Sequence, residues 1–260
     1  MFIVSGDKTY LEDYYHEGYY YGIKRNRVDS SSTHRRIKWF SRYLEDWQNK
    51  QVLEIGCGQG HLLKAIQNQG ARVHGIEPSV PDCLIAGSLS GHENISVCML
   101  SDFQTQAVYD AVVLVHSFEH MPDPMATLQH IRTLLKPDGW LFVEVPNFFS
   151  STGFYRKRKG VHSYPSPNHL FIYTPATLMG MLRKTGFENI SKAYNYRNMR
   201  LVFRPGQDRS VIKEPGINTY KRVWAFFLVL KFMAGTKNLL YRLLRVFKHR
   251  KYANPATRIK

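Results

Sequence analysis

The chain has 260 residues, a length that suits one α/β domain with a modest addition. With 43% hydrophobic residues it can fill a core, which excludes a wholly disordered protein. The three cysteines, Cys57, Cys83 and Cys98, form no C-x-x-C pair and are too few for a disulfide framework, which indicates a reducing compartment or no constraint. The N-terminus shows no basic stretch before an apolar run, so we expect a cytoplasmic protein without a secretory signal.

The formal charge of +16 is concentrated at the C-terminus. Residues 221–260 contain eleven Lys and Arg and no Asp or Glu, which leaves only +5 for the rest of the chain. The body of the protein therefore has the charge of an ordinary soluble domain, and the tail carries the basic character.

Residues 1–50 are expected to form a helical lid or cap. The run "YYHEGYYYG" holds five tyrosines, and "SSSTHRRIKWFSRYLEDW" is typical of a capped helix with Ile37, Phe40 and Leu44 at helical spacing. A segment of this kind folds over a ligand or packs against the edge of a sheet, and the sequence does not separate the two.

Strand and helix signals alternate between residues 51 and 207. The expected strands are 51–56, 72–77, 94–100, 109–116 and 140–146, and 187–196 with 199–203 could close the sheet as a final pair. The expected helices are 61–70, 123–135 and 174–186. This rhythm predicts an α/β fold with a doubly wound, mostly parallel, seven-stranded sheet.

The stretch "VLEIGCGQG" places three glycines after the first strand. Their spacing is G-x-G-x-G, whereas a dinucleotide site needs G-x-G-x-x-G, and His61 stands where the third glycine would be. Glu77 ends the next strand, where a carboxylate can accept both hydroxyls of a ribose. Without a pyrophosphate to bind, the site tolerates Glu54, which would suit a cationic ligand.

These motifs resemble the class I S-adenosylmethionine-dependent methyltransferases, from about Val52 to Phe203. The matching segments are "VLEIGCGQG", "GIEPS", "SDF", "YDAVVLVHSFEHMPDP" and "LLKPDGWLFVEVPN". The resemblance implies S-adenosylmethionine as the cofactor. It places Gly56, Cys57, Gly58 and Gly60 along its methionine part, Glu77 on its ribose, Asp102 and Phe103 beside its adenine, and His116 where the fourth strand meets it. The alternative is a generic nucleotide-binding domain whose glycines serve packing.

The segment "HSFEHMPDP" resembles the small-molecule methyltransferases, such as those of quinone pathways and polysaccharide gene clusters, as does "SPNHLFIYTPATLMGMLRKTGF". The chain has no Asn/Asp-Pro-Pro-aromatic run after the fourth strand, and no cysteine follows Cys98. We therefore expect O-methylation of a small, glycan or lipid-linked acceptor. An RNA-directed methyltransferase and an inactive scaffold of the same fold remain the alternatives.

A hydroxyl acceptor requires a base for its proton, and histidine suits neutral pH. His120 and His169 are the candidates, because both lie in loops at the carboxyl edge of the sheet, where open sheets bind ligands. Each could instead be structural, His120 in the turn around "PDP" and His169 as a capping or packing residue. His116 and His120 also have the i,i+4 spacing of metal ligands, but zinc needs three or four ligands and no further cluster is nearby, so we expect no metal.

Residues 208–260 are expected to form a basic amphipathic helical tail. The apolar stretch from Val223 stops at Lys231, too short to cross ~30 Å of hydrocarbon. Further on, leucines and Phe247 gather on one helical face, and Arg, Lys and His residues on the other. This pattern favours peripheral binding of 221–251 to an anionic membrane surface at the inner face. A packed or dimeric helix is the alternative, and nucleic acid, although basic charge attracts phosphate, is not the expected partner.

Overall fold

The computed structural model describes residues 2–3, 30–147, 169–194 and 198–206. The chain divides into two compact units, 1–212 and 213–260, and all described residues belong to the first. Residues 4–29 of the expected lid and the expected tail at 208–260 lie outside the described residues. Among the helices that are described, none is both long enough and apolar enough to cross a membrane.

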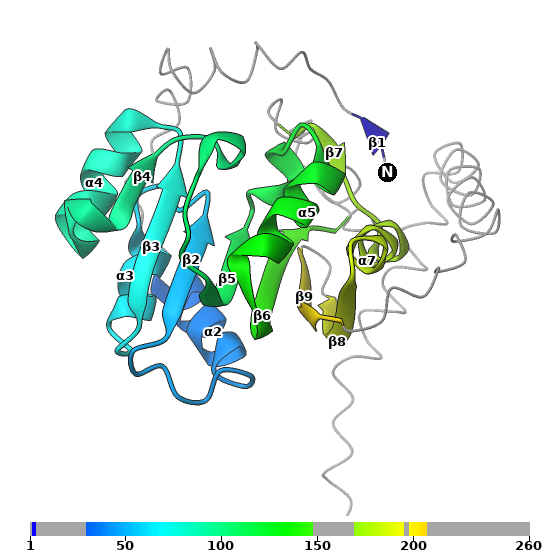
Figure 1. The fold of residues 1–260 in the computed structure, drawn as a ribbon, viewed down its shortest axis with the longest axis horizontal. Helices are drawn as coiled ribbons and strands as arrows, with labels where there is room; N and C mark the ends of the chain where they lie inside the picture. The colour runs from blue at the N-terminus through cyan, green and yellow to red at the C-terminus, as the bar shows by residue number, and fades with distance from the viewer. Residues whose placement is uncertain (1, 4–29, 148–168, 195–197, 207–260) are drawn as a thin grey trace, which may run out of the picture. The chain divides into compact units, whose positions relative to one another are not determined.

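In the described part of the chain, seven strands form one sheet in the order β4-β3-β2-β5-β6-β9-β8 (Figure 1). Only β9 runs antiparallel to its neighbours, β6 and β8. A separate antiparallel pair joins β1 (Phe2–Ile3) to β7 (Phe171–Ile172). The seven strands are β2 (Gln51–Ile55), β3 (Arg72–Glu77), β4 (Ile95–Val97), β5 (Tyr109–Val115), β6 (Leu135–Pro146), β8 (Phe187–Tyr194) and β9 (Asn198–Pro205). The doubly wound, mostly parallel sheet and its final pair are thus confirmed.

Helices pack on both faces of this sheet. Successive side chains of a strand point to opposite faces, so buried residues on both faces need a covering helix. Val52 belongs to a buried cluster with residues of α2 (Ser30–Phe40) and α3 (His61–Gln67). The next residue, Leu53, belongs to a second cluster with residues of α5 (Pro124–Leu134) and α7 (Pro175–Lys184). Figure 1 shows α5 in front of the sheet and α2 and α3 behind it. Two cores, one on each face, hold the strands whose carboxyl ends build the site.

Helix α2 ends earlier than the sequence predicts. It stops at Phe40, and the turn that follows buries Leu44 and Trp47. The Phe40 ring lies 4.7 Å, centroid to centroid, from that of Phe142 in β6. Leu44 is therefore apolar because the turn after α2 is buried, and not because the helix continues to it.

Helix α4 (Val80–Ser90) was not predicted. Pro81 stands in its first turn, and the Ser79 hydroxyl caps it by accepting a hydrogen bond from the amide of Asp82 at 3.4 Å. The helix is apolar around most of its circumference, so it lacks the one-sided pattern by which a surface helix is read from sequence.

Candidate functional site

A cavity of about 580 Å³ opens at the carboxyl ends of β2, β3 and β5. This is the edge at which open parallel sheets bind ligands. Most of the residues proposed from the sequence line this cavity, and they come from β2 and β3 and from the segments that follow β2 and β5. Those that line it are Glu54, Gly56, Cys57, Gly58, Glu77, His116 and His120. Gly60, Asp102, Phe103 and His169 are not among the lining residues.

The glycine loop after β2 needs its glycines for two different reasons. Gly56 and Gly60 both have a φ of 75°, which favours glycine. A Cβ on Gly56 would lie 2.6 Å from the Cβ of Ser117, and one on Gly60 would lie 2.8 Å from the Cβ of Ala86 in α4. A Cβ on Gly58 would meet nothing within 4 Å. The outer glycines therefore let the chain pack, whereas the middle one leaves open backbone in the cavity.

The buried carboxylate of Glu77 is tied to this loop. One oxygen accepts a hydrogen bond from the amide of Gly58 at 3.0 Å, and the other accepts one from the amide of Ser79 at 3.0 Å. Each oxygen has a further lone pair, so the carboxylate can still accept the hydroxyls of a ribose. Glu77 therefore shapes the loop as well as lining the cavity.

Glu54 is buried, and its Oε2 has no hydrogen-bond partner in the described part of the chain. Burial raises the pKa of Glu54 to about 8, even though the charge of Arg36 acts in the opposite direction. A buried acceptor without a partner suits a cationic group such as the amine of a methionine moiety. The open backbone at Gly58 and the acceptors of Glu54 and Glu77 fit S-adenosylmethionine.

Asp102 and Phe103, which the resemblance places beside the adenine, lie outside this lining. Asp102 is exposed, and Phe103 is buried with its ring 5.4 Å, centroid to centroid, from that of His74. Met99 and Leu100, just before them, line the cavity instead. Contact of Asp102 and Phe103 with the adenine stays a prediction.

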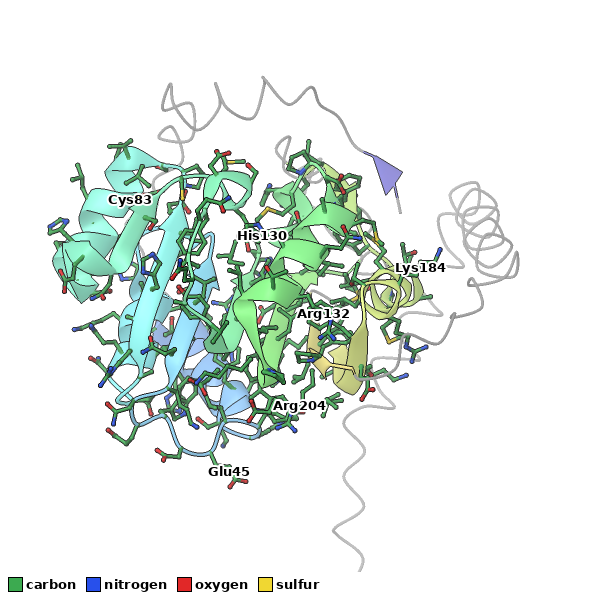
Figure 2. The ribbon with its side chains drawn as sticks, in the orientation of Figure 1. Glu45, Cys83, His130, Arg132, Lys184 and Arg204 are labelled. Atoms are coloured by element: carbon green, nitrogen blue, oxygen red, sulfur yellow. The ribbon has the colours of Figure 1, made fainter. Side chains whose placement is uncertain are left out.

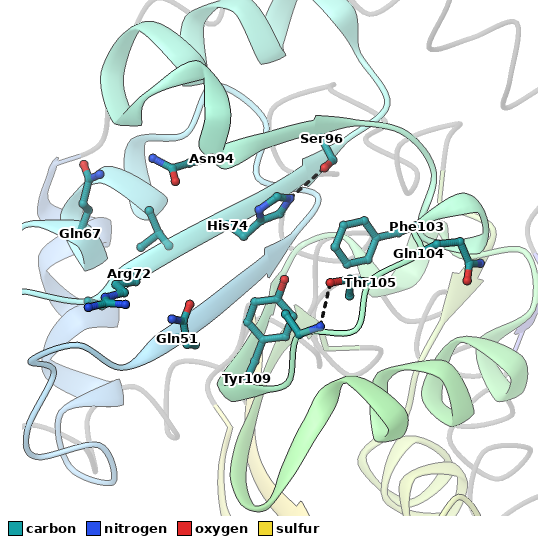
Figure 3. Close-up of a pocket in the computed structure, with 13 residues that line it drawn as sticks. Gln51, Gln67, Arg72, His74, Asn94, Ser96, Phe103, Gln104, Thr105 and Tyr109 are labelled. Atoms are coloured by element: carbon teal, nitrogen blue, oxygen red, sulfur yellow. Dashed lines mark hydrogen bonds between the residues drawn. The ribbon is translucent and has the colours of Figure 1, made fainter.

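Phe103 lines a second cavity, of about 610 Å³, on the open face of β3 and β4 (Figure 3). This cavity exists because the connection from β4 to β5 contains a short 3-10 turn, Leu100–Asp102, and no α-helix that would cover the sheet. The imidazole of His74 and the hydroxyl of Ser96, 2.8 Å apart, face it. It shares no lining residue with the first cavity.

His116 follows β5 and lies between two buried carboxylates. Its φ is 57°, a rare backbone conformation for a residue with a side chain. Its Nδ1 is 3.5 Å from an oxygen of Glu119, and its Nε2 is 3.4 Å from one of Glu144. Burial disfavours the imidazolium, but the bonds and charges of the two carboxylates outweigh this and raise the pKa of His116 to about 9. The raised pKa favours the protonated form of His116 at neutral pH, which makes it a poor candidate for the base.

Glu144 in β6 is the centre of a charged cluster that sequence reasoning missed. Arg36 of α2 donates to both of its oxygens, at 3.3 and 3.1 Å, and Arg200 and Asn198 of β9 donate at 2.8 and 2.7 Å. Burial would raise the pKa of Glu144, but His116 and Arg36 hold it well below its usual range. Arg36 also lines the cavity, so this cluster fixes α2 beside the cofactor site.

The two candidate bases, His120 and His169, come together although they lie far apart in the chain. Their rings pack edge to face, with centroids 4.9 Å apart. His120 lines the cavity, and His169 lies behind it, with Nε2 3.8 Å from an oxygen of Glu119. Burial lowers the pKa of His169, which keeps its imidazole neutral at neutral pH and able to accept a proton.

Together with Glu119, His120 and His169 could also act as metal ligands. Glu119 is buried, and among the described residues its nearest basic neighbours are His116, with Nδ1 3.5 Å from Oε1, and His169, with Nε2 3.8 Å from the same oxygen. Ligand atoms of Glu119, His120 and His169 all lie within 4.8 Å of one another, so these three side chains could hold a divalent metal ion. The set differs from the His116 and His120 pair considered from sequence. The expectation of no metal stays a prediction.

Comparison with known proteins places this site in a family. A family model described as a methyltransferase domain matches residues 30–192. The chain is 32% identical over 170 residues to a ubiquinone biosynthesis O-methyltransferase of Bordetella avium, covering 59% of this chain and 68% of that protein. It is 32% identical over 122 residues to the corresponding protein of Histophilus somni, covering 43% of this chain and 51% of that protein. The chain thus spans about half the length of some curated relatives that it matches.

A solved structure shares the fold. Magnesium protoporphyrin IX methyltransferase from Synechocystis PCC 6803, with bound S-adenosylhomocysteine, superimposes with a TM-score of 0.60 at 17% identity, covering 77% of this chain and all of that one. The matched residues include the glycine loop, Glu77 and the segment from His116 to His120. The cavity that these residues line suits the cofactor of this family. The chain belongs to the class I S-adenosylmethionine-dependent methyltransferase family.

Proposed function

We propose that this protein transfers the methyl group of S-adenosylmethionine to an oxygen atom of a small, glycan or lipid-linked acceptor. One observation carries the proposal: a single cavity joins the glycine loop and Glu77 to His120, with His169 directly behind it. The residues expected to bind the cofactor and a candidate base therefore line the same cavity. The relatives named as ubiquinone biosynthesis O-methyltransferases support oxygen as the methylated atom.

The protein's own part in this reaction is mainly alignment. S-adenosylmethionine supplies an activated methyl group, and an in-line displacement needs acceptor, methyl and sulfur in a row. Glu77 would bind the ribose hydroxyls, and Glu54 would accept from the amine. Residues Ser32, Thr33 and Arg36 of α2 form another wall of the cavity and help to exclude water from it.

The proton of the acceptor hydroxyl would pass to the imidazole of His120, which lines the cavity, or to that of His169, which packs against it. His169 is suited to this because burial keeps its imidazole neutral, whereas His116 is already protonated between its two carboxylates. Glu119 lies beside both rings of the pair and would stabilise the imidazolium that forms.

Mass spectrometry of a panel of acceptors tests this function. The purified chain is incubated with S-adenosylmethionine and with phenols, sugars and lipid-linked alcohols, and products are examined for one added methyl group on oxygen. Glu77→Gln is the matched control, because it keeps the size of the side chain and loses its charge. Methyl groups found only on RNA, or on nitrogen or carbon, would contradict O-methylation.

The proposed partner of the tail is an anionic membrane at the cytoplasmic face, reached through residues 221–251. The support is compositional: eleven basic residues and no acid in 221–260, with leucines and Phe247 on one helical face. Liposome flotation of the full chain, compared with a truncation before Lys221, tests it. Added salt should weaken binding without abolishing it, because the apolar face also contributes, whereas a purely electrostatic RNA contact should collapse steeply. A full chain that fails to float with anionic vesicles would contradict this partner.

A further inference from the structure

Helix α4 turns apolar side chains to the solvent. Val80, Leu84 and Ile85 have 47%, 61% and 41% of their surface exposed. Their spacing of four and five residues puts them on one side of the helix. Pro81 and Ser88 are exposed on the same side, so this side of α4 carries no charge. We call Val80, Leu84 and Ile85 the α4 patch.

The buried side of α4 reverses the usual arrangement. Its buried residues are Asp82, Cys83, Ala86, Gly87 and Ser90, which are small or polar. Asp82 is the single charged residue of the helix and is 2% exposed. A surface helix normally puts its aliphatic residues inward and its charges outward. The larger aliphatic side chains of α4 are thus available to an apolar environment outside the protein.

The α4 patch borders the proposed active site. Helix α4 begins three residues after Glu77, and Pro78 and Asp82 line the cofactor cavity. Ala86 on the inner side packs against Gly60 of the glycine loop. In Figure 1 the helix lies beside β4 at the outer end of the sheet, and Figure 2 labels Cys83 on it. Whatever covers the patch therefore lies next to the rim of the cavity.

We propose that the α4 patch inserts into the surface of an anionic lipid bilayer and holds the rim of the cavity against it. This inference rests on the proposed membrane partner and adds a second, independent contact to the one proposed for the tail. Residues 1–220, which include α4, still carry a net charge of +5, which suits an anionic surface, and the uncharged side of α4 adds apolar burial. A lipid-linked acceptor could then present its reactive end to the cavity while its apolar part stays in the membrane.

The size of the patch favours a bilayer over a second copy of the chain. A stable interface buries about 800 Å² on each partner. Three aliphatic side chains, each already partly covered, supply only a fraction of that area. Insertion into a bilayer has no such threshold, because each apolar group that is transferred contributes separately to the binding free energy.

Paired substitutions in the full chain test the docking. The test variant is Leu84→Gln with Ile85→Gln. The matched control is Val108→Gln, just before β5, with Ile190→Gln in β8, because both residues are 46% exposed and lie away from α4. Binding is measured by flotation with vesicles of phosphatidylglycerol and phosphatidylcholine. The test variant should partition on the order of tenfold more weakly than wild type, and the control should match wild type. Both should keep wild-type melting temperatures and cofactor affinity, because the changed side chains are exposed.

Three results would overturn the docking: equal flotation of the test variant and wild type, no flotation of the wild type, or a wild-type dimer that the test variant converts to a monomer without vesicles. The last would show that the patch joins two copies. Because flotation needs no turnover, its failure is distinct from failure of the proposed function. Docking through α4 by a chain that methylates no acceptor would contradict methyl transfer alone.

Discussion

The carboxylate of Glu77 accepts a hydrogen bond from the amide of Gly58 across 3.0 Å, which joins the end of β3 to the centre of the glycine loop. A second bond from the amide of Ser79 fixes the other oxygen. The side chain expected to bind the ribose is thus also part of the scaffold that shapes the cavity.

Replacement of Glu77 should therefore affect both binding and stability. Glu77→Ala should weaken S-adenosylmethionine binding by about 2–4 kcal/mol, the worth of a charge-assisted pair of hydrogen bonds. It should also lower the free energy of unfolding by about 1–3 kcal/mol, because two amides lose their acceptor. Calorimetric titration and urea unfolding measure the two effects. Unchanged cofactor affinity in a folded variant would refute the ribose assignment.

The position of Glu77 at the end of a strand, as read from the sequence, predicts the loss of cofactor affinity but not the loss of stability. Local patterns found the strands and the glycine loop, because alternation and glycine spacing are read over a few residues. They missed α4, whose exposed side is aliphatic and whose acid, Asp82, is buried. They also missed the contact of Arg36 with Glu144, since it joins residues 108 positions apart and no local pattern records such a pair.

The histidine site shows the same limit. His120 and His169 were proposed separately, each from its place at the sheet edge, and the fold brings their rings together. Glu119 lies inside the quoted motif "HSFEH" but was given no role, because burial of its carboxylate between histidines is a property of the folded chain.

Cofactor binding should depend on pH through Glu54. In the free protein the pKa of Glu54 is raised to about 8, so the group is protonated below that pH. A cationic amine favours the carboxylate, so binding should release a proton, and affinity should rise with pH by up to about tenfold per unit until pH 8 is passed. Titrations in buffers of different ionisation enthalpy measure the release. Glu54→Gln should abolish it, and an unchanged pH dependence in that variant would assign the effect elsewhere.

The two histidines should control turnover rather than cofactor binding. His120→Asn or His169→Asn should reduce turnover on the order of 10²–10⁴-fold if that residue accepts the proton. Activity should fall only at a pH below the ordinary imidazole pKa of about 6.5, because burial lowers the pKa of His169 and keeps the ring neutral to more acidic pH. His130→Asn is the control, because His130 is a half-buried residue of α5 that does not line the cavity. Near-normal turnover in both test variants would return His120 and His169 to structural roles.

Treatment with a chelator distinguishes two roles for His120 and His169, that of a base and that of a metal ligand. If His120 and His169 act as neutral bases, treatment with EDTA should leave turnover unchanged. Metal analysis of the purified protein should find no stoichiometric divalent ion. Loss of activity that one divalent metal restores would instead make Glu119, His120 and His169 ligands, the geometry that their 4.8 Å spacing permits.

Side-by-side calorimetric titration of the purified chain with S-adenosylmethionine and with NADH tests the central claim most directly. The G-x-G-x-G loop, the unpaired buried acceptor of Glu54 and the ribose acceptor Glu77 predict saturable binding of one S-adenosylmethionine per chain and no binding of NADH. Binding of NADH at the glycine loop, or the absence of S-adenosylmethionine binding by the folded chain, would contradict it.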